Sequence, residues 1–344
     1  MKKFFLNNFN SKINPLNKLF YIGLFLLPSA FSIATILLFI SLIISTFNRK
    51  DKFFNDKLNI FFLVGGVLMI LSSFVHTFKD NLMPYELDSN LTWIGLANWL
   101  PFFWCYWGFK PFLNSYEKRK KSGLILLSGT FPVLITGIGQ YFFNWNGPFE
   151  IFNGLIIWYQ RPLNGETGLT GLFNNPNYAG CWLNIIWPFC LAALIDKGNN
   201  FIKNISIYFF NFGISISTIL TNSRSSWIGI FLGILLMFGE KSFKLISVII
   251  LIIGIFFGAT LFPIFGESIQ NFLHTIIPEL MLEEFIDFQY SRIEIWQSGI
   301  NLVINHPFFG TGAGSFPEIF KYQTNFWKGH AHNLPLELMI SYGI

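Results

Sequence analysis

Long, uninterrupted apolar runs dominate this chain and limit what it can fold into. Crossing a bilayer takes a helix of about 20 apolar residues, and only helices or closed barrels satisfy their backbone groups in lipid. The runs are continuous rather than alternating, so they predict membrane helices and exclude a barrel. A composition of 52% hydrophobic and 12% charged residues agrees. The runs fall at 19–47, 58–78, 93–109, 123–143, 178–195, 204–221, 226–239 and 245–263, and another opens at Leu334.

The loops between the runs alternate in charge. Segment 110–122 holds five basic residues against one glutamate, whereas segment 264–333 holds seven carboxylates against three basic residues. Because loops rich in lysine and arginine stay in the cytoplasm, this alternation predicts that 264–333 lies on the outer side. The formal net charge of +5 follows from this topology and indicates no nucleic-acid partner.

The first run decides the number of spans. Its 29 residues would make about 43 Å of helix, too long for one upright span and too short for two full ones. The lysine-rich N-terminus and Arg49 lie on the same side only if the chain turns back near Pro28 and Ser29. We therefore predict an all-α integral membrane protein, a polytopic helical bundle of nine spans with one large outer loop. A tenth span starts at Leu334 and is cut off at Ile344, which predicts a C-terminally incomplete chain.

The large outer loop, 264–333, contains one amphipathic pattern. Residues 290–305 carry an apolar stripe at helical spacing, which predicts a helix on top of the bundle or in the headgroup layer. His306 and Pro307 are expected to end it. The glycine-rich segment 310–314 follows a helix and no Lys-Ser/Thr follows it, so we interpret it as a flexible backbone bend rather than a nucleotide loop. The stripe consists of Ile293, Trp296, Ile300, Val303 and Ile304.

A polar turn at 171–178 comes directly before a span. Its asparagines, Asn175 and Asn177, have two interpretations. They are simple helix caps at the entry to the span, or their amides bind a polar headgroup. Arg161, in the same acidic loop, is a weaker candidate for contacting such a ligand.

Two arginines stand at the outer ends of helices. Arg224 interrupts an apolar stretch, and an ionisable residue near membrane depth is a functional candidate by default, although a snorkelling anchor is the alternative. Arg292 opens the amphipathic pattern beside Glu294. It forms either a local surface ion pair or a guanidinium fork for phosphate oxygens.

Two histidines, His330 and His332, come just before the last apolar run. A histidine near neutral pKa suits proton transfer. A metal site is the alternative, but no carboxylate or cysteine partner stands at a suitable spacing. The three cysteines lie in apolar runs and are expected to pack there. We expect no metal and no cofactor.

The order of these segments resembles the O-antigen ligase and polysaccharide polymerase superfamily of bacterial inner-membrane proteins. The resemblance covers roughly residues 165–344. The signature of its ligases, His-Asn followed by nine residues and Gly, matches His332, Asn333 and Gly343. The other matching segments are Gly-Leu-Phe-Asn-Asn-Pro-Asn from Gly171, Ser-Arg-Ser-Ser-Trp from Ser223, Ser-Arg-Ile-Glu-Ile-Trp from Ser291, and Asn-His-Pro-Phe-Phe-Gly-Thr-Gly-Ala-Gly from Asn305.

The resemblance implies a metal-independent glycosyltransferase of cell-surface polysaccharide and lipopolysaccharide synthesis. Such an enzyme moves a glycan from undecaprenyl diphosphate, a lipid-linked oligosaccharide donor, to a glycan or glycolipid acceptor on the periplasmic face of the bacterial inner membrane. It further implies N-terminal membrane helices over 1–160 and an O-antigen ligase-like membrane domain over 161–344. Ligation and polymerisation both stay open.

The resemblance also assigns roles to the candidate residues. Arg224 and Arg292 would hold the diphosphate and stabilise charge on the leaving group. His332 would be the general base for the acceptor hydroxyl. The proposed substrate-binding residues are Arg161, Asn175, Asn177, His330 and Asn333.

Two other classes of function compete with the transferase. Some members of the superfamily are labelled bicarbonate carriers, so a membrane transporter is the first alternative. Carriers generally place ionisable groups at mid-membrane, whereas nearly all such groups here fall in loops. The second alternative is a non-catalytic scaffold that binds lipid-linked oligosaccharide.

Overall fold

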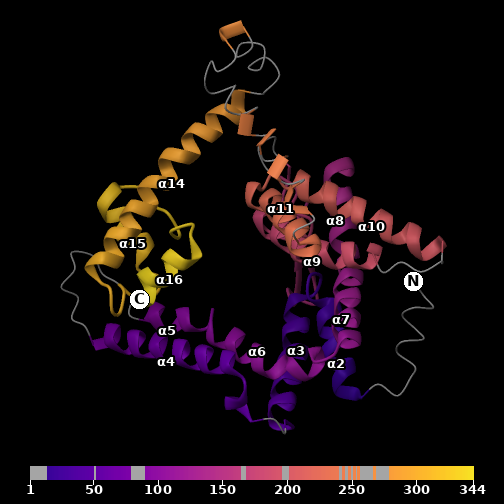
Figure 1. Ribbon diagram of the computed structural model, residues 1–344, viewed down its shortest axis with the longest axis horizontal. Coiled ribbons are helices and arrows are strands. Elements are labelled where there is room, and N and C mark those ends of the chain that lie inside the picture. The colour runs from indigo at the N-terminus through magenta and orange to yellow at the C-terminus, as the bar shows by residue number, and fades with distance from the viewer. Residues whose placement is uncertain are drawn as a thin grey trace. The chain divides into compact units, whose positions relative to one another are not determined.

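The computed structural model divides the chain into two compact units, each of which is described by itself. The first unit consists of Met1–Arg49 and Gly108–Ile253, and the second of Lys50–Trp107 and Gly254–Ile344. The fold is mainly helical (Figure 1). The structure describes residues 14–49, 52–78, 90–163, 168–195, 201–239, 242–244, 247–248, 251–252, 254–255, 266–268 and 279–344.

The helices of the first unit match the apolar runs. They are α2 (Pro15–Leu26), α3 (Phe31–Phe47), α7 (Tyr116–Gly129), α8 (Phe131–Phe143), α9 (Pro176–Ile195), α10 (Phe201–Leu220) and α11 (Arg224–Phe238). The predicted turn in the first run is present, because α2 ends at Leu26 and α3 begins at Phe31. The backbone N–H groups of Ser29 and Ala30 both donate to the Leu26 carbonyl, which closes the turn.

Three helices of the described residues are long and apolar enough to cross a membrane by themselves. They are Lys57–Phe78, Tyr116–Phe143 (α7 and α8 counted as one run) and Pro176–Ile195. Four shorter apolar helices lie in the same part of the chain, at Pro15–Leu26, Phe31–Phe47, Ile205–Leu220 and Ser225–Phe238. The chain is therefore a helical membrane protein, and the count of nine spans stays a prediction. Most of the predicted span 245–263 lies outside the described residues.

The core of the first unit joins α7, α8, α9 and α10 around fully buried aliphatic side chains such as Leu183, Ile186 and Ile214. Helix α11 packs on α9 through small residues. A Cβ atom at Gly229 of α11 would collide with the Asn184 amide of α9. Small residues let membrane helices approach closely where no hydrophobic force drives them together. The glycine is therefore part of the helix contact.

A small antiparallel sheet corrects the all-α prediction. Strands β1 (Phe149–Ile151) and β2 (Ile156–Trp158) pair between α8 and α9, with Phe149 opposite Trp158. Asn153 and Gly154 in the connecting turn both have positive φ. An Asn-Gly pair between two short β-branched and aromatic segments is a hairpin signal. This signal was present in the sequence but was overlooked beside the stronger helical runs.

The second unit combines segments from both ends of its sequence. It contains η1 (Phe53–Asn55), α4 (Lys57–Phe78), α5 (Asn90–Leu96), α14 (Glu279–Asn305), α15 (Phe316–Thr324) and α16 (Leu334–Tyr342), and α6 (Leu100–Leu113) begins in it. Ser72 Oγ donates to the Phe309 carbonyl at 2.7 Å, and His76 Nε2 lies 3.0 Å from the same oxygen. These two polar side chains of α4 therefore hold the loop that precedes α15.

Helix α14 is longer than the predicted 290–305. It begins at Glu279, so Arg292 lies in its middle rather than at its start, and it ends at Asn305 as predicted. The segment 279–290 contains neither proline nor glycine and is rich in leucine, methionine and glutamate, which favour helix. Four stripe residues, Ile293, Trp296, Ile300 and Ile304, are exposed. The face that packs against α15 and α16 is a second one, with Ile295, Leu302 and Val303 buried.

The segment 310–314 is a bend that packs closely, and its flexibility stays a prediction. The Thr311 N–H donates to the Ile340 carbonyl at 2.7 Å, and Thr311, Ala313 and Ser315 are buried. Gly310 has φ +64° and lies against the same carbonyl, where a Cβ atom would collide. The bend therefore packs closely against α16. Helix α16 covers Leu334–Tyr342, and the predicted span that starts at Leu334 stays a prediction.

Candidate functional site

The candidate residues fall into two groups, one in each unit. Arg161, Asn175, Asn177 and Arg224 belong to the first unit, and Arg292, His330, His332 and Asn333 belong to the second.

In the first unit, the starts of α9 and α11 lie at the same end of the unit as the loop that carries Arg161. The Leu169 N–H donates to the Leu220 carbonyl at 2.8 Å, and Gly168 packs against the backbone of Thr221. Gly180 of α9 contacts the side chain of Ser226 in the first turn of α11. Arg224 is the first residue of α11, and its side chain lies outside the described part of the structure.

The asparagine turn has a clear local role. Asn175 Oδ1 accepts a hydrogen bond from the Asn177 N–H at 2.7 Å, and Pro176 follows as the first residue of α9. This is the capping arrangement that the simpler interpretation predicted. The Asn177 side chain is exposed, so it is the member of the pair that can reach a ligand.

A buried glutamine holds the loop that carries Arg161. Gln140 of α8 is 1% exposed, and its Oε1 accepts hydrogen bonds from the Thr170 and Gly171 N–H groups at 3.0 Å each. Its Nε2 donates to Thr170 Oγ1 at 3.0 Å and to the Arg161 carbonyl, and Thr170 Oγ1 accepts from the Arg161 N–H. Arg161 itself is exposed. This network was missed, although a lone glutamine in the apolar run 123–143 was a signal.

In the second unit, the two histidines contact each other. Their ring centroids are 4.1 Å apart, and the His332 N–H donates to His330 Nδ1 at 3.1 Å. His330 Nδ1 therefore carries no proton in this arrangement. His332 adopts the left-handed conformation with φ +53°, which is uncommon for a side chain of its size.

Positive charge surrounds His332. Its pKa is lowered from 6.5 to about 4, first by partial burial of the ring and then by the charges of His330, Arg292 and Lys328. The residue as a whole is exposed, so a ligand can reach the imidazole. Arg292 is half-buried on α14, whose inner face packs with Ala331 and α16. The lowered pKa keeps His332 neutral at pH 7, and the positive charges of Arg292 and Lys328 act on it.

A helix cap supports the histidine loop. Asn333 Oδ1 accepts from the Leu336 N–H at 3.2 Å and caps α16, which explains this asparagine locally. Glu337, one residue further along the helix, reaches back and accepts from the Ala331 N–H through Oε2 at 2.7 Å. Neither Glu337 nor Lys328 was recognised in the sequence. A capping box has its glutamate three residues after the cap, whereas Glu337 stands four residues after Asn333, so the spacing gave no signal for it.

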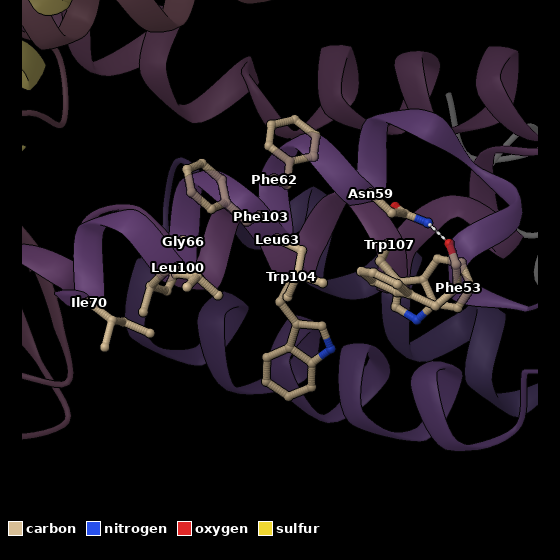
Figure 2. A pocket seen from close by; sticks show the side chains of 11 residues that line it. Phe53, Asn59, Phe62, Leu63, Gly66, Ile70, Leu100, Phe103, Trp104 and Trp107 are labelled. Carbon is tan, nitrogen blue, oxygen red and sulfur yellow. Dashed lines mark hydrogen bonds between the residues drawn. The ribbon is translucent and has the colours of Figure 1, made fainter. Parts of the chain in front are cut away.

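An apolar groove of about 230 Å³ lies between α4 and α6 in the second unit (Figure 2). Its one amide side chain, Asn59, is satisfied because Nδ2 donates to the Phe53 carbonyl at 2.8 Å. Gly66 of α4 leaves room on the floor of the groove, against Leu100 and Phe103. With such a lining the groove suits a hydrocarbon chain rather than a charged group. Its aromatic walls are Phe53, Phe62, Phe103, Trp104 and Trp107.

Among the described residues, no group of three or more histidine, cysteine, aspartate or glutamate side chains is arranged to hold a metal ion. The paired histidines supply two side chains of a metal-binding type, one fewer than such a group needs. Glu337, the carboxylate nearest to them in the sequence, is engaged with the backbone of Ala331.

Comparison with known families gives one match. Residues 209–344 match the model of the O-antigen ligase family. The matched region includes Arg224, Arg292 and both histidines, and the predicted resemblance is confirmed for this part of the chain. No curated protein matches the sequence.

Proposed function

We propose, starting from the O-antigen ligase-like C-terminal part, that this membrane protein transfers a glycan from undecaprenyl diphosphate to an acceptor sugar on the periplasmic face of the bacterial inner membrane. The family match supports a membrane glycan ligase or polymerase in general. The observation that carries the finer proposal is the contact between the rings of His330 and His332 in the loop before α16, where the charges of Arg292 and Lys328 also act on His332.

His332 is proposed as the general base. In the unliganded protein, its low pKa keeps it unprotonated and able to accept the proton of the acceptor hydroxyl. A pKa near 4 alone would make a weak base, because efficient proton transfer favours a pKa close to the working pH. A bound diphosphate would offset the charges of Arg292 and Lys328, so the pKa of His332 would rise when the donor is present. Binding of the donor would thus make His332 a stronger base.

The arginines are proposed to stabilise the leaving group. As the acceptor oxygen bonds to the anomeric carbon, the bond from that carbon to the diphosphate oxygen breaks, and charge collects on the diphosphate. Guanidinium groups hold such oxygens through paired hydrogen bonds, and their effect is largest where charge develops. Arg292 of the second unit is proposed for this role, and Arg224 is proposed to join it from the first. This chemistry needs no metal and no cofactor.

The remaining polar candidates are proposed to contact sugars. Arg161 and Asn177 are exposed at the end of the first unit where α11 begins. Asn175 and Asn333 use their side-chain oxygens in turns, so their amide N–H₂ groups are the atoms proposed to donate to a sugar. His330 supports the loop through Nδ1, and its Nε2 is proposed to donate to the acceptor.

The groove between α4 and α6 is proposed to hold the isoprenoid tail of the donor. Helix α4 has 22 residues and a mean hydropathy of 2.3 in its most apolar window, and is about 33 Å long. The groove follows this span, and it is proposed to open toward lipid. Flat aromatic rings along it offer contact area to an unsaturated, methyl-branched chain.

The proposal is tested in membranes supplied with a lipid-linked donor and an acceptor. His332→Ala and Arg292→Ala are expected to abolish transfer while expression stays normal. Arg292→Lys keeps the charge but loses the fork, so it should recover only a small part of the activity. Lys321→Ala, on the exposed side of α15, is the control and should transfer normally.

Unchanged transfer in both His332→Ala and Arg292→Ala would remove the proposed roles. A transporter would give a different result. Uptake of labelled bicarbonate into proteoliposomes that survives both substitutions would favour the carrier.

A further inference from the structure

The His330–Asn333 loop is held by one carboxylate that sequence reasoning overlooked. Glu337 lies in the first turn of α16, half-buried, and its Oε2 accepts from the Ala331 N–H at 2.7 Å. Ala331 is 0% exposed and belongs to the core cluster of α14, α15 and α16. The bond therefore fixes the backbone between the two histidines to the helix that follows.

Two further contacts lock the same turn. The Glu337 N–H donates to the Asn333 carbonyl at 2.8 Å, and the Leu336 N–H donates to Asn333 Oδ1. Between these anchors, His332 has φ +53°, a left-handed conformation that such a side chain keeps only where its surroundings over-determine it. A carboxylate at a helix start is also favoured by the helix dipole. Glu337 is thus the side chain that can keep His332 in a strained backbone conformation.

We infer that Glu337 is a positioning residue: its carboxylate clamps the Ala331 amide and thereby aims the His332 imidazole at the reacting hydroxyl. This inference rests on the proposed function for its chemical consequence. The clamp needs an acceptor at the reach of a glutamate side chain. A glutamine supplies such an acceptor, an aspartate is one methylene too short, and an alanine supplies none.

The variants Glu337→Gln, Glu337→Asp and Glu337→Ala separate these possibilities. With donor and acceptor supplied, the alanine and aspartate variants should lose kcat by about tenfold to a hundredfold, since a 1 Å misplacement can cost about 10²-fold. Their KM for the donor should stay unchanged, because the arginines are untouched. Glu337→Gln should keep most of kcat. Glu318→Ala, at the exposed start of α15, is the matched control and should behave as wild type.

A second measurement does not depend on transfer. Diethyl pyrocarbonate modifies neutral imidazoles, and fragment mass spectrometry resolves His330 from His332. Releasing the clamp should change the rate ratio of the two histidines in the alanine and aspartate variants, but not in the glutamine or Glu318→Ala proteins. If wild type shows no transfer but this ratio changes, the proposed function fails and the clamp stands.

Wild-type kcat and a wild-type rate ratio in Glu337→Ala would overturn the inference. If Glu337→Ala does not fold, Glu337→Asp decides the question by the same two readouts. Equal loss of kcat in the aspartate and glutamine variants would also overturn it, because the reach of the acceptor would then be irrelevant.

Discussion

At the scale of single residues, burial first and neighbouring charge second decide the protonation state of His332. Partial burial and the neighbouring cations lower its pKa to about 4, so the folded protein binds fewer protons than the unfolded chain between about pH 4 and 6.5. The stability that this histidine contributes is therefore fully present above pH 6.5 and is lost as the pH falls through that window. The same charges leave the imidazole neutral, and thus ready to accept a proton, at any pH near neutrality.

Removing one of these charges should raise the pKa of His332. In Lys328→Met, modification of His332 by diethyl pyrocarbonate should begin to decline at a higher pH than in wild type, which should stay reactive down to about pH 5. The measurement is the rate of modification at His332 against pH, by mass spectrometry. Lys321→Met is the control and should leave the profile unchanged. If the two lysine variants gave the same profile, the charge of Lys328 would have no part in the shift.

At the scale of elements, the sequence predicted the bounds of single helices, but it did not predict which elements pack against each helix face. The break between α2 and α3 and the end of α14 follow from helix length, topology and a histidine-proline pair. The buried face of α14 could not be predicted in this way, because the exposed stripe of the same helix is also apolar. Only the contact with α15 and α16 shows that Ile295 and Leu302 are the buried residues. The hydrogen bonds of Gln140 could not be predicted either, because its partners lie 21 to 31 residues away in the sequence.

The groove along α4 gives a prediction at this scale. Leu63 lines the groove and Leu68 lies on the opposite face of the same helix. Leu63→Trp should fill part of the groove and raise the KM for a long-chain donor several-fold, whereas Leu68→Trp, which places the same bulk on the outer face, should not. A donor analogue with a short isoprenoid tail should be affected less by Leu63→Trp. An equal effect of both variants on both donors would mean that the groove holds no part of the donor.

At the scale of the whole molecule, the two compact units are interleaved along the chain. The second unit joins 50–107 with 254–344, and the hydrogen bond from Ser72 to the Phe309 carbonyl links residues 237 positions apart. The proposed division at residue 160 stays a prediction about the extent of the ligase-like part. Arg224 lies in the first unit and Arg292 and His332 in the second, so their convergence in one site is also a prediction.

Cross-linking checks that convergence. Ser225→Cys in the first turn of α11 and Phe326→Cys before the histidine loop are both at exposed positions. In a background with Cys105, Cys181 and Cys190 replaced by alanine, a short bifunctional maleimide should join this pair in membranes. Pairing Ser225→Cys with Phe54→Cys, at the other end of the roughly 33 Å long α4, is the control and should give no cross-link. Joining of the control pair alone would place the start of α11 away from the histidines.

The sequence alone determined that this is a helical membrane protein, where most apolar helices begin and end, and that Arg224 and the two histidines stand next to helix starts. These properties depend on composition and on neighbours within one or two helical turns. Only the tertiary structure decided that the pKa of His332 is lowered, that the Glu337 carboxylate accepts from the Ala331 N–H, and that the bend at 310–314 packs against α16. Each of these properties depends on residues that packing brings together from distant parts of the chain. Such contacts produce no periodic pattern in the sequence, so they could not be predicted from it.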